Sequence, residues 1–307
     1  MKLELARSAG FCYGVRRAVE MAEQAARSGC RCVMLGPVIH NGSVIERLKA
    51  QGVALAETPE QVPEGAAVII RSHGEGRPVH QALAARGCRV IDATCPNVAR
   101  IHHLVARAEA EGRQVLIIGM RAHPEVQAIA GWCGHPVVLE GAQELEQWLQ
   151  EGPERKSLPL TMVSQTTSTQ MIWDLSVEKA KKQCTNLKIF DTICNATYKR
   201  QSEAQALAAR CGAMIVIGGR DSSNTKRLWE LCAALCPDTV WIERAAELEP
   251  SNLCRKASIG ITAGASTPGW IIKEVYDKMS DEIMEIEESF ADLLEKSIKT
   301  LNTGEKV

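Results

Sequence analysis

The chain has 307 residues, enough for a large core and two or three domains, and its 36 basic and 37 acidic residues give a net charge of −1. This balance predicts no general attraction to nucleic acid or membranes, and an aromatic content of 4% argues against a base-stacking surface. Residues 1–20 lack the apolar core of a signal peptide and no apolar run reaches membrane-spanning length, so we expect a cytoplasmic protein. Twelve cysteines in such a chain favour metal or redox chemistry over a disulfide scaffold.

The first part of the chain alternates short apolar runs with amphipathic stretches. The apolar runs predict strands at residues 3–6, 32–35 and 67–70. The amphipathic stretches predict helices at residues 15–28, 44–50 and 78–86, with Ser43 as the N-cap of the second. The loops that follow the three strands carry Cys12, His40 and His73.

The same order of elements returns twice. A strand ending at residue 91 leads to Cys95, and strands at residues 114–118 and 160–163 lead to polar loops with His123, Glu125 and Thr166. Strands at residues 187–190, 213–217 and 258–262 then lead to loops with Cys194, Ser222, Ser223, Asn224 and Ser266. Helices are expected between these strands, so the pattern predicts parallel sheets covered by helices. Ligands of such sheets bind at the carboxyl ends of the strands, where all of these polar loops lie.

The spacing of three cysteines indicates an internal repeat. Glycine follows 24 residues after Cys12, Cys95 and Cys194, and the fourth residue beyond each glycine is His40, His123 or Ser222. Strand, cysteine, helix, strand and polar loop recur together, with a period of 83–99 residues. We therefore expect an α/β protein of three similar units with mostly parallel sheets, at residues 1–90, 91–187 and 188–280, arranged with pseudo-three-fold symmetry around a central cavity.

A pseudo-three-fold arrangement would bring the three equivalent cysteines to one point. Three converging thiolates suggest an iron–sulfur cluster with one iron left open for substrate. Zinc remains an alternative, although a structural zinc site needs four protein ligands. The nine other cysteines are expected to pack as small apolar residues: Cys30, Cys32, Cys88, Cys133, Cys184, Cys211, Cys232, Cys236 and Cys254.

The loop motifs, taken in chain order, resemble the 4-hydroxy-3-methylbut-2-enyl diphosphate reductases over residues 10–275. They are Gly10-Phe-Cys12-Tyr-Gly14, Gly36-Pro-Val-Ile-His40-Asn41, Arg71-Ser-His73-Gly74, Asp92-Ala-Thr-Cys95-Pro96, His123-Pro-Glu125, Ser164-Gln165-Thr166-Thr167, Ser222-Ser223-Asn224 and Thr262-Ala-Gly-Ala-Ser266. The resemblance implies an iron–sulfur oxidoreductase of the non-mevalonate isoprenoid pathway. Its substrate would lose a hydroxyl group by two-electron, two-proton reduction, giving isopentenyl and dimethylallyl diphosphates.

The resemblance also implies a [4Fe-4S] cluster on Cys12, Cys95 and Cys194, reduced by a ferredoxin- or flavodoxin-type donor. The open iron would bind the substrate hydroxyl group, and cleavage of that C–O bond needs a proton. We expect Glu125 to supply it, with Thr166 as a relay or positioning residue and His123 in the same catalytic group. The alternative for Glu125 is a first-turn glutamate that the helix dipole favours.

Diphosphate binding requires hydrogen-bond donors. We expect them from His40, His73, His123, Thr166, Ser222, Ser223, Asn224 and Ser266. The serines and the asparagine could instead serve as helix N-caps, and the two functions are compatible.

Residues 281–307 predict an acidic amphipathic helix that resembles the linker between some bacterial reductases of this family and S1-type RNA-binding domains. The natural chain could thus continue beyond Val307 into an RNA-binding domain, and the alternative is a surface helix. We expect no nucleic acid or membrane partner for residues 1–280, and a monomer, because a three-fold repeat within one chain needs no second copy.

Two other functions remain open from the residues alone. A three-cysteine iron–sulfur dehydratase acting on a carboxylate would need arginines in its cavity, whereas the repeated polar positions here are His, Ser, Thr and Asn. A cluster-containing redox or iron sensor would need neither Glu125 nor a ring of phosphate donors.

Overall fold

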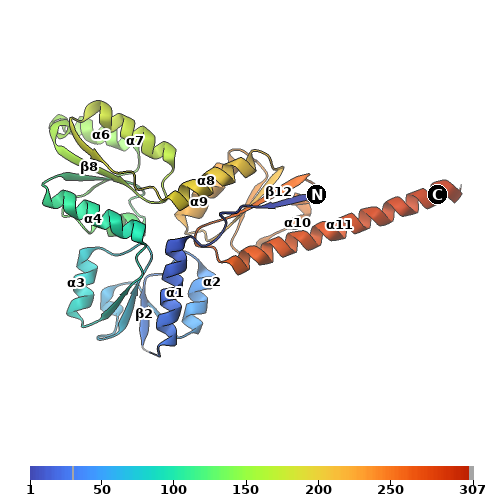
Figure 1. The fold of residues 1–307 in the computed structure, drawn as a ribbon, viewed down its shortest axis with the longest axis horizontal. Coiled ribbons are helices and arrows are strands. Elements are labelled where there is room, and N and C mark those ends of the chain that lie inside the picture. The colour runs from blue at the N-terminus through green and yellow to red at the C-terminus, as the bar shows by residue number, and fades with distance from the viewer. Residues whose placement is uncertain (30, 304–307) are drawn as a thin grey trace.

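The computed structural model describes residues 1–29 and 31–303, which form three four-stranded sheets with helices on both faces (Figure 1). The strands are β1 (Lys2–Leu5), β2 (Cys32–Leu35), β3 (Ala54–Ala56), β4 (Ala67–Ile70), β5 (Arg89–Asp92), β6 (Gln114–Ile118), β7 (Val137–Leu139), β8 (Pro159–Ser164), β9 (Asn186–Ile189), β10 (Ala213–Ile217), β11 (Thr239–Ile242) and β12 (Ser258–Ala263). The α-helices are α1 (Tyr13–Arg27), α2 (Gly42–Ala50), α3 (Arg77–Ala85), α4 (Pro96–Ala110), α5 (Pro124–Ala130), α6 (Ala142–Glu151), α7 (Gln170–Gln183), α8 (Asn195–Ala208), α9 (Ser223–Ala233), α10 (Pro250–Leu253) and α11 (Gly269–Thr303). Every strand pair is parallel, which confirms the predicted fold class.

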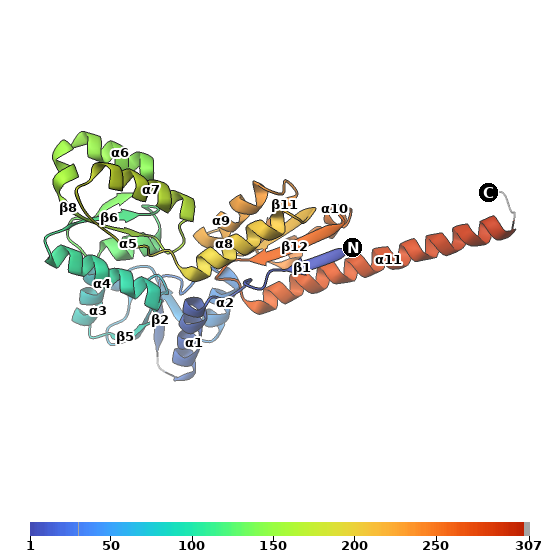
Figure 2. The same cartoon turned by 45° about the horizontal axis from the view of Figure 1, so that its top comes forward.

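The three sheets have the same strand order: β3-β2-β4-β5, β7-β6-β8-β9 and β11-β10-β12-β1. The last strand of each sheet leads into the cysteine of the next unit, β5 into Cys95, β9 into Cys194 and β1 into Cys12. The N-terminal strand thus lies within the C-terminal unit, where Leu3 pairs with Ile259, and it closes a ring of three units (Figures 1 and 2). The predicted range 1–90 therefore includes one strand that belongs to another sheet, and the domain boundaries stay a prediction.

Burial on both faces explains the continuous apolar runs of the central strands. In the first sheet, Met34 and Ile69 pack in one core cluster, while Val33 and Val68 pack in a second cluster on the opposite face. The other two sheets are also divided between two clusters each. Alternate residues of a strand point to opposite faces, so neither face can be polar and the sheet ends are left to carry chemistry.

The first four helices begin one or two residues before the predicted positions, and one N-cap differs from the prediction. The N-cap of α2 is Asn41, whose side chain accepts a hydrogen bond from the amide of Val44, so the assignment of Ser43 was wrong. Asparagine is an equally good cap, and α2 begins at Gly42, before the predicted position. The short edge strands β3, β7 and β11 were not predicted.

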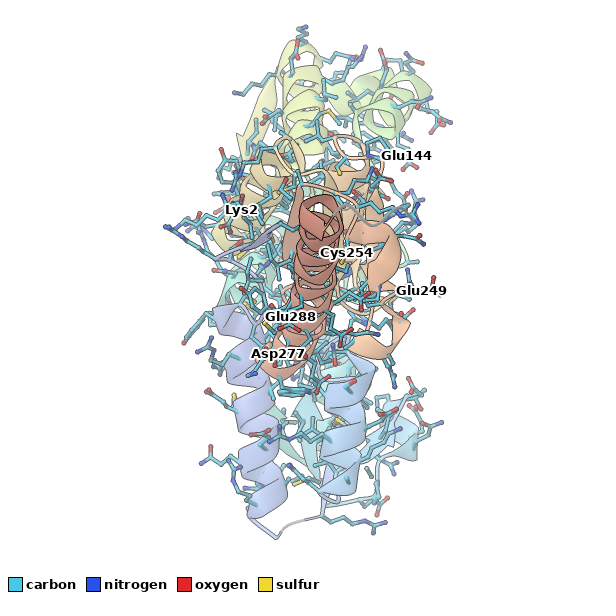
Figure 3. The ribbon with its side chains drawn as sticks, turned by 90° about the vertical axis from the view of Figure 1, so that its right-hand side faces the viewer. Lys2, Glu144, Glu249, Cys254, Asp277 and Glu288 are labelled. Carbon is cyan, nitrogen blue, oxygen red and sulfur yellow. The ribbon has the colours of Figure 1, made fainter. Side chains whose placement is uncertain are left out.

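The long helix α11 begins in the third unit and extends away from the three sheets (Figure 1). Val275 and Met279 anchor it in the core of that unit, and Met284 is already 53% exposed. Figure 3 views the molecule along this helix, with Asp277 and Glu288 on it and Cys254 beside it. Residues 304–307 of the predicted tail, like Cys30, lie outside the described residues. Within the part of the chain that is described, no helix has the length and apolar composition needed to cross a bilayer.

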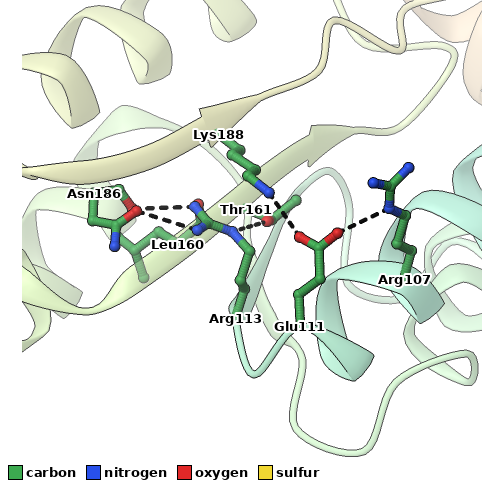
Figure 4. Close-up of polar contacts among 7 residues, drawn as sticks. All are labelled: Arg107, Glu111, Arg113, Leu160, Thr161, Asn186 and Lys188. Carbon is green, nitrogen blue, oxygen red and sulfur yellow. Dashed lines mark hydrogen bonds and ion pairs between the residues drawn. The ribbon is translucent and has the colours of Figure 1, made fainter.

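A polar network fixes β9, the strand that leads to Cys194, to the rest of the second unit (Figure 4). Arg113, between α4 and β6, donates to Thr161 Oγ1 at 2.9 Å and to Asn186 Oδ1 at 3.2 Å. Glu111 accepts from Arg107 and, at 2.7 Å, from Lys188 of β9. These contacts hold one edge strand against β8 and α4, and through β9 they help to position Cys194.

Candidate functional site

Each of the three repeat cysteines is the N-cap residue of a helix. Cys12 precedes α1, Cys95 precedes α4 and Cys194 precedes α8, and none of the three thiols caps its helix. Their backbone amides donate to equivalent carbonyl groups, in the loops after β12, β4 and β8: those of Ala265, Ser72 and Thr166. The three helices therefore begin close together at the centre of the molecule (Figure 1).

The three thiols line one cavity. Burial raises the pKa of the Cys95 thiol, the amides of Asn97 and Val98 lower it, and the nearby Cys12 and Cys194 raise it further. Gly14 packs so closely on Cys95 that a Cβ atom there would lie 2.4 Å from the sulfur. Asn97 donates to the sulfur of Cys194 at 3.1 Å. These contacts place the sulfurs of three units around one point.

This donor set fits an iron–sulfur cluster. Thiolates are the ligands that such clusters prefer, and helix N-termini stabilise them. Among the described residues that line the cavity there is no fourth cysteine, so one metal position would have no protein thiolate. A structural zinc site would need a fourth ligand and fits less well.

Three histidines from two units face each other in the same cavity. The ring centroids of His40 and His73 are 4.6 Å apart, and that of His123 lies 6.0 and 5.5 Å from them. One nitrogen of each ring lies within 4.8 Å of one nitrogen of the other two, a spacing at which three imidazoles can share a metal ion.

The hydrogen bonding of His123 favours an anion over a metal. Its Nδ1 accepts the amide of Glu125 at 3.1 Å, so in the neutral ring the proton is on Nε2. Metal coordination through Nε2 would move this proton to Nδ1, where it would face the amide N–H group. Burial lowers the pKa of all three histidines, to about 4 for His123, so the rings are neutral near pH 7 and can donate N–H groups.

Glu125 is buried beside the histidines, with 2% of its surface exposed. Its carboxylate accepts the backbone amide and the hydroxyl group of Thr166, both at 2.6 Å. Burial raises the pKa of Glu125, and the two bonds from Thr166 oppose this rise. A buried carboxyl group with a raised pKa that lines a cavity is a good candidate for proton transfer.

The third unit contributes small polar side chains to the same cavity. Ser222 caps α9, because its Oγ accepts the amide of Thr225, and Ser266 donates to the carbonyl oxygen of His40 at 3.0 Å. Asn224 is 5% exposed, yet neither atom of its amide has a partner among the described residues. Buried polar groups are almost always paired, so Asn224 indicates that a polar ligand belongs in this cavity.

All twelve predicted site residues therefore line one cavity. Their proposed roles stay predictions, because geometry alone assigns none of them. Sequence reasoning missed Asn97 and Arg200, which also line the cavity. Arg200 stands six residues after Cys194, a position that the buried Ala18 and Ile101 occupy in the other units. A charge at a repeat position that is otherwise apolar was the available signal.

Comparison with known proteins gives a consistent result. The family model described as LytB protein matches residues 3–280. Proteins named 4-hydroxy-3-methylbut-2-enyl diphosphate reductase are 39% identical in a Nitratiruptor species and 40% identical in Geobacter sulfurreducens; the matches cover 91% and 92% of this chain and 98% of each relative. A relative of that name in Clostridium tetani is also 40% identical over 92% of this chain, which corresponds to 44% of its own length.

Two solved structures are similar to this fold. One is described as (E)-4-hydroxy-3-methyl-but-2-enyl diphosphate reductase, the terminal enzyme of the non-mevalonate pathway. It is 38% identical with a TM-score of 0.68, and the match covers 92% of this chain and all of that one. The other, E-1-hydroxy-2-methyl-but-2-enyl-4-diphosphate reductase from Plasmodium falciparum, is 27% identical with a TM-score of 0.82, covering 90% of this chain and 87% of that one.

Proposed function

Because the chain belongs to the LytB family and is an oxidoreductase of the non-mevalonate pathway, we propose that it reduces 4-hydroxy-3-methylbut-2-enyl diphosphate to isopentenyl diphosphate and dimethylallyl diphosphate. The observation that carries the proposal is the shared cavity: three thiols, a buried carboxyl group and a set of N–H and O–H donors line it together. An allylic alcohol diphosphate needs these three kinds of group.

Cys12, Cys95 and Cys194 would hold the cluster. When bound, a [4Fe-4S] cluster supplies electrons and an iron without a fourth protein ligand. Gly14 leaves room for the sulfur of Cys95, and Asn97 donates to that of Cys194. Arg200 is buried, and burial lowers the pKa of its guanidinium group. The nearby Cys12 and Cys194 oppose this effect and raise the pKa. Its positive charge favours an anionic group bound to the thiolates.

Glu125 would supply the proton for cleavage of the C–O bond. The reaction takes up two electrons and two protons, releases one water molecule and leaves a C–H bond in each product. Protonation of the leaving hydroxyl group requires an acid within hydrogen-bond reach, and burial keeps Glu125 protonated to a higher pH than an exposed glutamate. Thr166, whose hydroxyl group donates to Glu125, can relay this proton or orient the substrate hydroxyl group.

The diphosphate would bind to neutral donors. His123 can donate from Nε2, because Nδ1 accepts the amide of Glu125, and His40 and His73 offer buried nitrogens without a partner among the described residues. Ser222, Ser223, Asn224 and Ser266 provide further donors near the N-terminus of α9, whose dipole favours an anion.

Electrons would come from a ferredoxin- or flavodoxin-type donor, and the protein would act as a monomer in the cytoplasm. A reducing compartment suits thiolates that must remain free to bind iron. The ring of three units is complete within one chain, so the cavity needs no residue from a second copy.

Anaerobic purification with iron and sulfide counting, followed by turnover with a reduced one-electron dye, tests the proposal. We expect about four irons per chain and turnover that depends on them. Full activity in a colourless, iron-free preparation would contradict the proposed mechanism.

A further inference from the structure

Arg71 and Glu75 form an ion pair on either side of Ser72 and His73 in the chain, and these two residues line the cavity while the pair lies outside its lining. Nη2 of Arg71 lies 2.6 Å from Oε1 of Glu75, and only 18% and 11% of the two side chains are exposed. Nε of Arg71 is buried and has no partner among the described residues. A cation is therefore held close to the site by a single carboxylate.

The internal repeat shows that the fold does not require this cation. Arg71, Gln165 and Gly264 are equivalent, since each directly follows the inner strand β4, β8 or β12. The repeat glycine Gly36 faces Arg71, and a Cβ atom there would lie 3.1 Å from Nη1. At the same place in the second unit, Gly119 faces the neutral Gln165. One position thus carries a charged, a neutral and no side chain in three similar units, so a local function explains the arginine better than folding does.

The diphosphate end of the cavity is otherwise neutral. Its lining offers imidazole, hydroxyl and amide groups, and the single arginine among the described lining residues, Arg200, lies near Cys12 and Cys194. The charge of Arg71, by contrast, reaches all three histidines. After burial it is the next cause that lowers the pKa of His40, and at His73 and His123 it adds to the effects of burial and of the neighbouring histidines. The same positive potential acts on any anion bound between the rings.

We infer that Arg71 is a positioning residue for the diphosphate, which it attracts through its charge from just outside the cavity lining. Glu75 fixes the guanidinium and limits its potential. The inference rests on the proposed function and adds a residue that does not touch the ligand.

The two partners of the pair should have opposite effects. Removing the charge of Arg71 weakens anion binding, whereas removing the charge of Glu75 leaves the cation in place and maintains or strengthens binding. If the pair only stabilised the loop, removing either charge would change the affinity for the anion in the same direction. The diphosphate does not react, so its attraction acts equally on the ground state and the transition state and should change KM more than kcat.

Isothermal titration calorimetry of inorganic diphosphate with the cluster-loaded protein tests whether the two substitutions have opposite effects on affinity. We expect Arg71→Gln to weaken binding by about tenfold or more and Glu75→Gln to keep or improve it. KM should rise in Arg71→Gln with kcat within about twofold of the wild type. Arg77→Gln is the matched control, because it removes an arginine from the same unit whose side chain is 45% exposed. It should bind diphosphate like the wild type.

The pH dependence of diphosphate affinity gives a second readout. Besides Arg71, the charged or titratable groups that act on the three rings are Asp221 and the rings themselves, with Glu125 adjacent. Loss of Arg71 should let the rings protonate at a higher pH, so the affinity of Arg71→Gln should recover as the pH is lowered. Arg71→Lys keeps a positive charge and should bind diphosphate with an affinity within about threefold of the wild type. This variant still tests the inference if Arg71→Gln does not fold.

Equal weakening by Arg71→Gln and Glu75→Gln, or unchanged affinity in Arg71→Gln, would overturn the inference. A wild-type protein that neither bound diphosphate nor reduced the substrate would instead refute the proposed function, and the inference with it.

Discussion

Thr166 connects the carboxyl group of Glu125 to the backbone of Cys194. Its amide and hydroxyl groups donate to Glu125 at 2.6 Å each, and its carbonyl oxygen accepts the amide of Cys194 at 3.0 Å. Thr166, the second residue after β8, thus fixes both the candidate proton donor and a candidate cluster ligand. Small movements of this loop would change the two together.

Glu125→Gln should retain the iron and bind inorganic diphosphate but lose most turnover. Glutamine keeps the size of the side chain and can still accept a hydrogen bond from Thr166, yet it has no proton to give. Loss of a positioned general acid costs about 10²–10⁴-fold in rate. Iron content, diphosphate titration and dye-driven turnover of the same preparation check this. Turnover within about threefold of the wild type would remove Glu125 from the proton path.

Gly14→Ala should lower iron content by displacing a cysteine. A Cβ atom at position 14 would lie 2.4 Å from the sulfur and 3.0 Å from the Cβ of Cys95, so either Cys95 or α1 must move. Gly42→Ala is the matched control, since it also lies at the first turn of a helix and its Cβ would meet no atom within 4 Å. We expect fewer irons per chain in the first variant and no change in the second. Equal iron content in both would mean that the sulfur of Cys95 is not held in place by Gly14.

The sequence predicted the central strands well because burial on both faces leaves a clear apolar signal. Strands β2, β4, β6 and β10 have the predicted bounds, and all four are surrounded by core residues. The edge strands β3, β7 and β11 have only three or four residues each, most of them incompletely buried, so these runs are too short to show a clear periodic pattern.

Pairing between distant segments left no signal in the local pattern. The position of β1 beside β12 depends on contacts between residues more than 250 positions apart. The spacing of the cysteines nevertheless predicted that the site residues lie together, because equivalent loops of a pseudo-symmetric repeat meet at its axis. Arg71 and Arg200 escaped this reasoning, since each breaks the repeat at one position, and only the folded arrangement shows what each charge faces.

His102 should make stability sensitive to pH below neutrality. It is 4% exposed and stacks on Trp132, and burial is the main cause that lowers its pKa to about 4. Between pH 6.5 and 4 the unfolded chain therefore binds a proton that the folded chain does not, so stability falls as the pH falls through this range. From pH 7 to pH 5 this one group accounts for a loss of about 2 kcal/mol.

Urea unfolding of His102→Gln at pH 7 and pH 5 tests this assignment. Between pH 7 and pH 5 the free energy of unfolding of the variant should fall by about 2 kcal/mol less than that of the wild type, whatever its value at pH 7. His135→Gln replaces an exposed histidine and should follow the wild type. An unchanged difference in His102→Gln would show that other buried groups, His123 among them, carry the acid sensitivity.

Arg113→Met should destabilise the second unit far more than Arg107→Met. Arg113 donates to Thr161, which is 1% exposed, and to the carbonyl oxygens of the buried Leu160 and the exposed Asn186, so its loss removes the donor shared by two buried residues of β8 and by β9 (Figure 4). We expect a cost of roughly 2–3 kcal/mol in the free energy of unfolding. Arg107 is 80% exposed and pairs with Glu111 at the surface, which contributes about 0–1 kcal/mol. Amide hydrogen exchange should also become faster in β9 of Arg113→Met, because that strand loses its hydrogen bonds from Arg113 at Asn186. Similar free energies of unfolding for the two variants would show that the network does not hold β9.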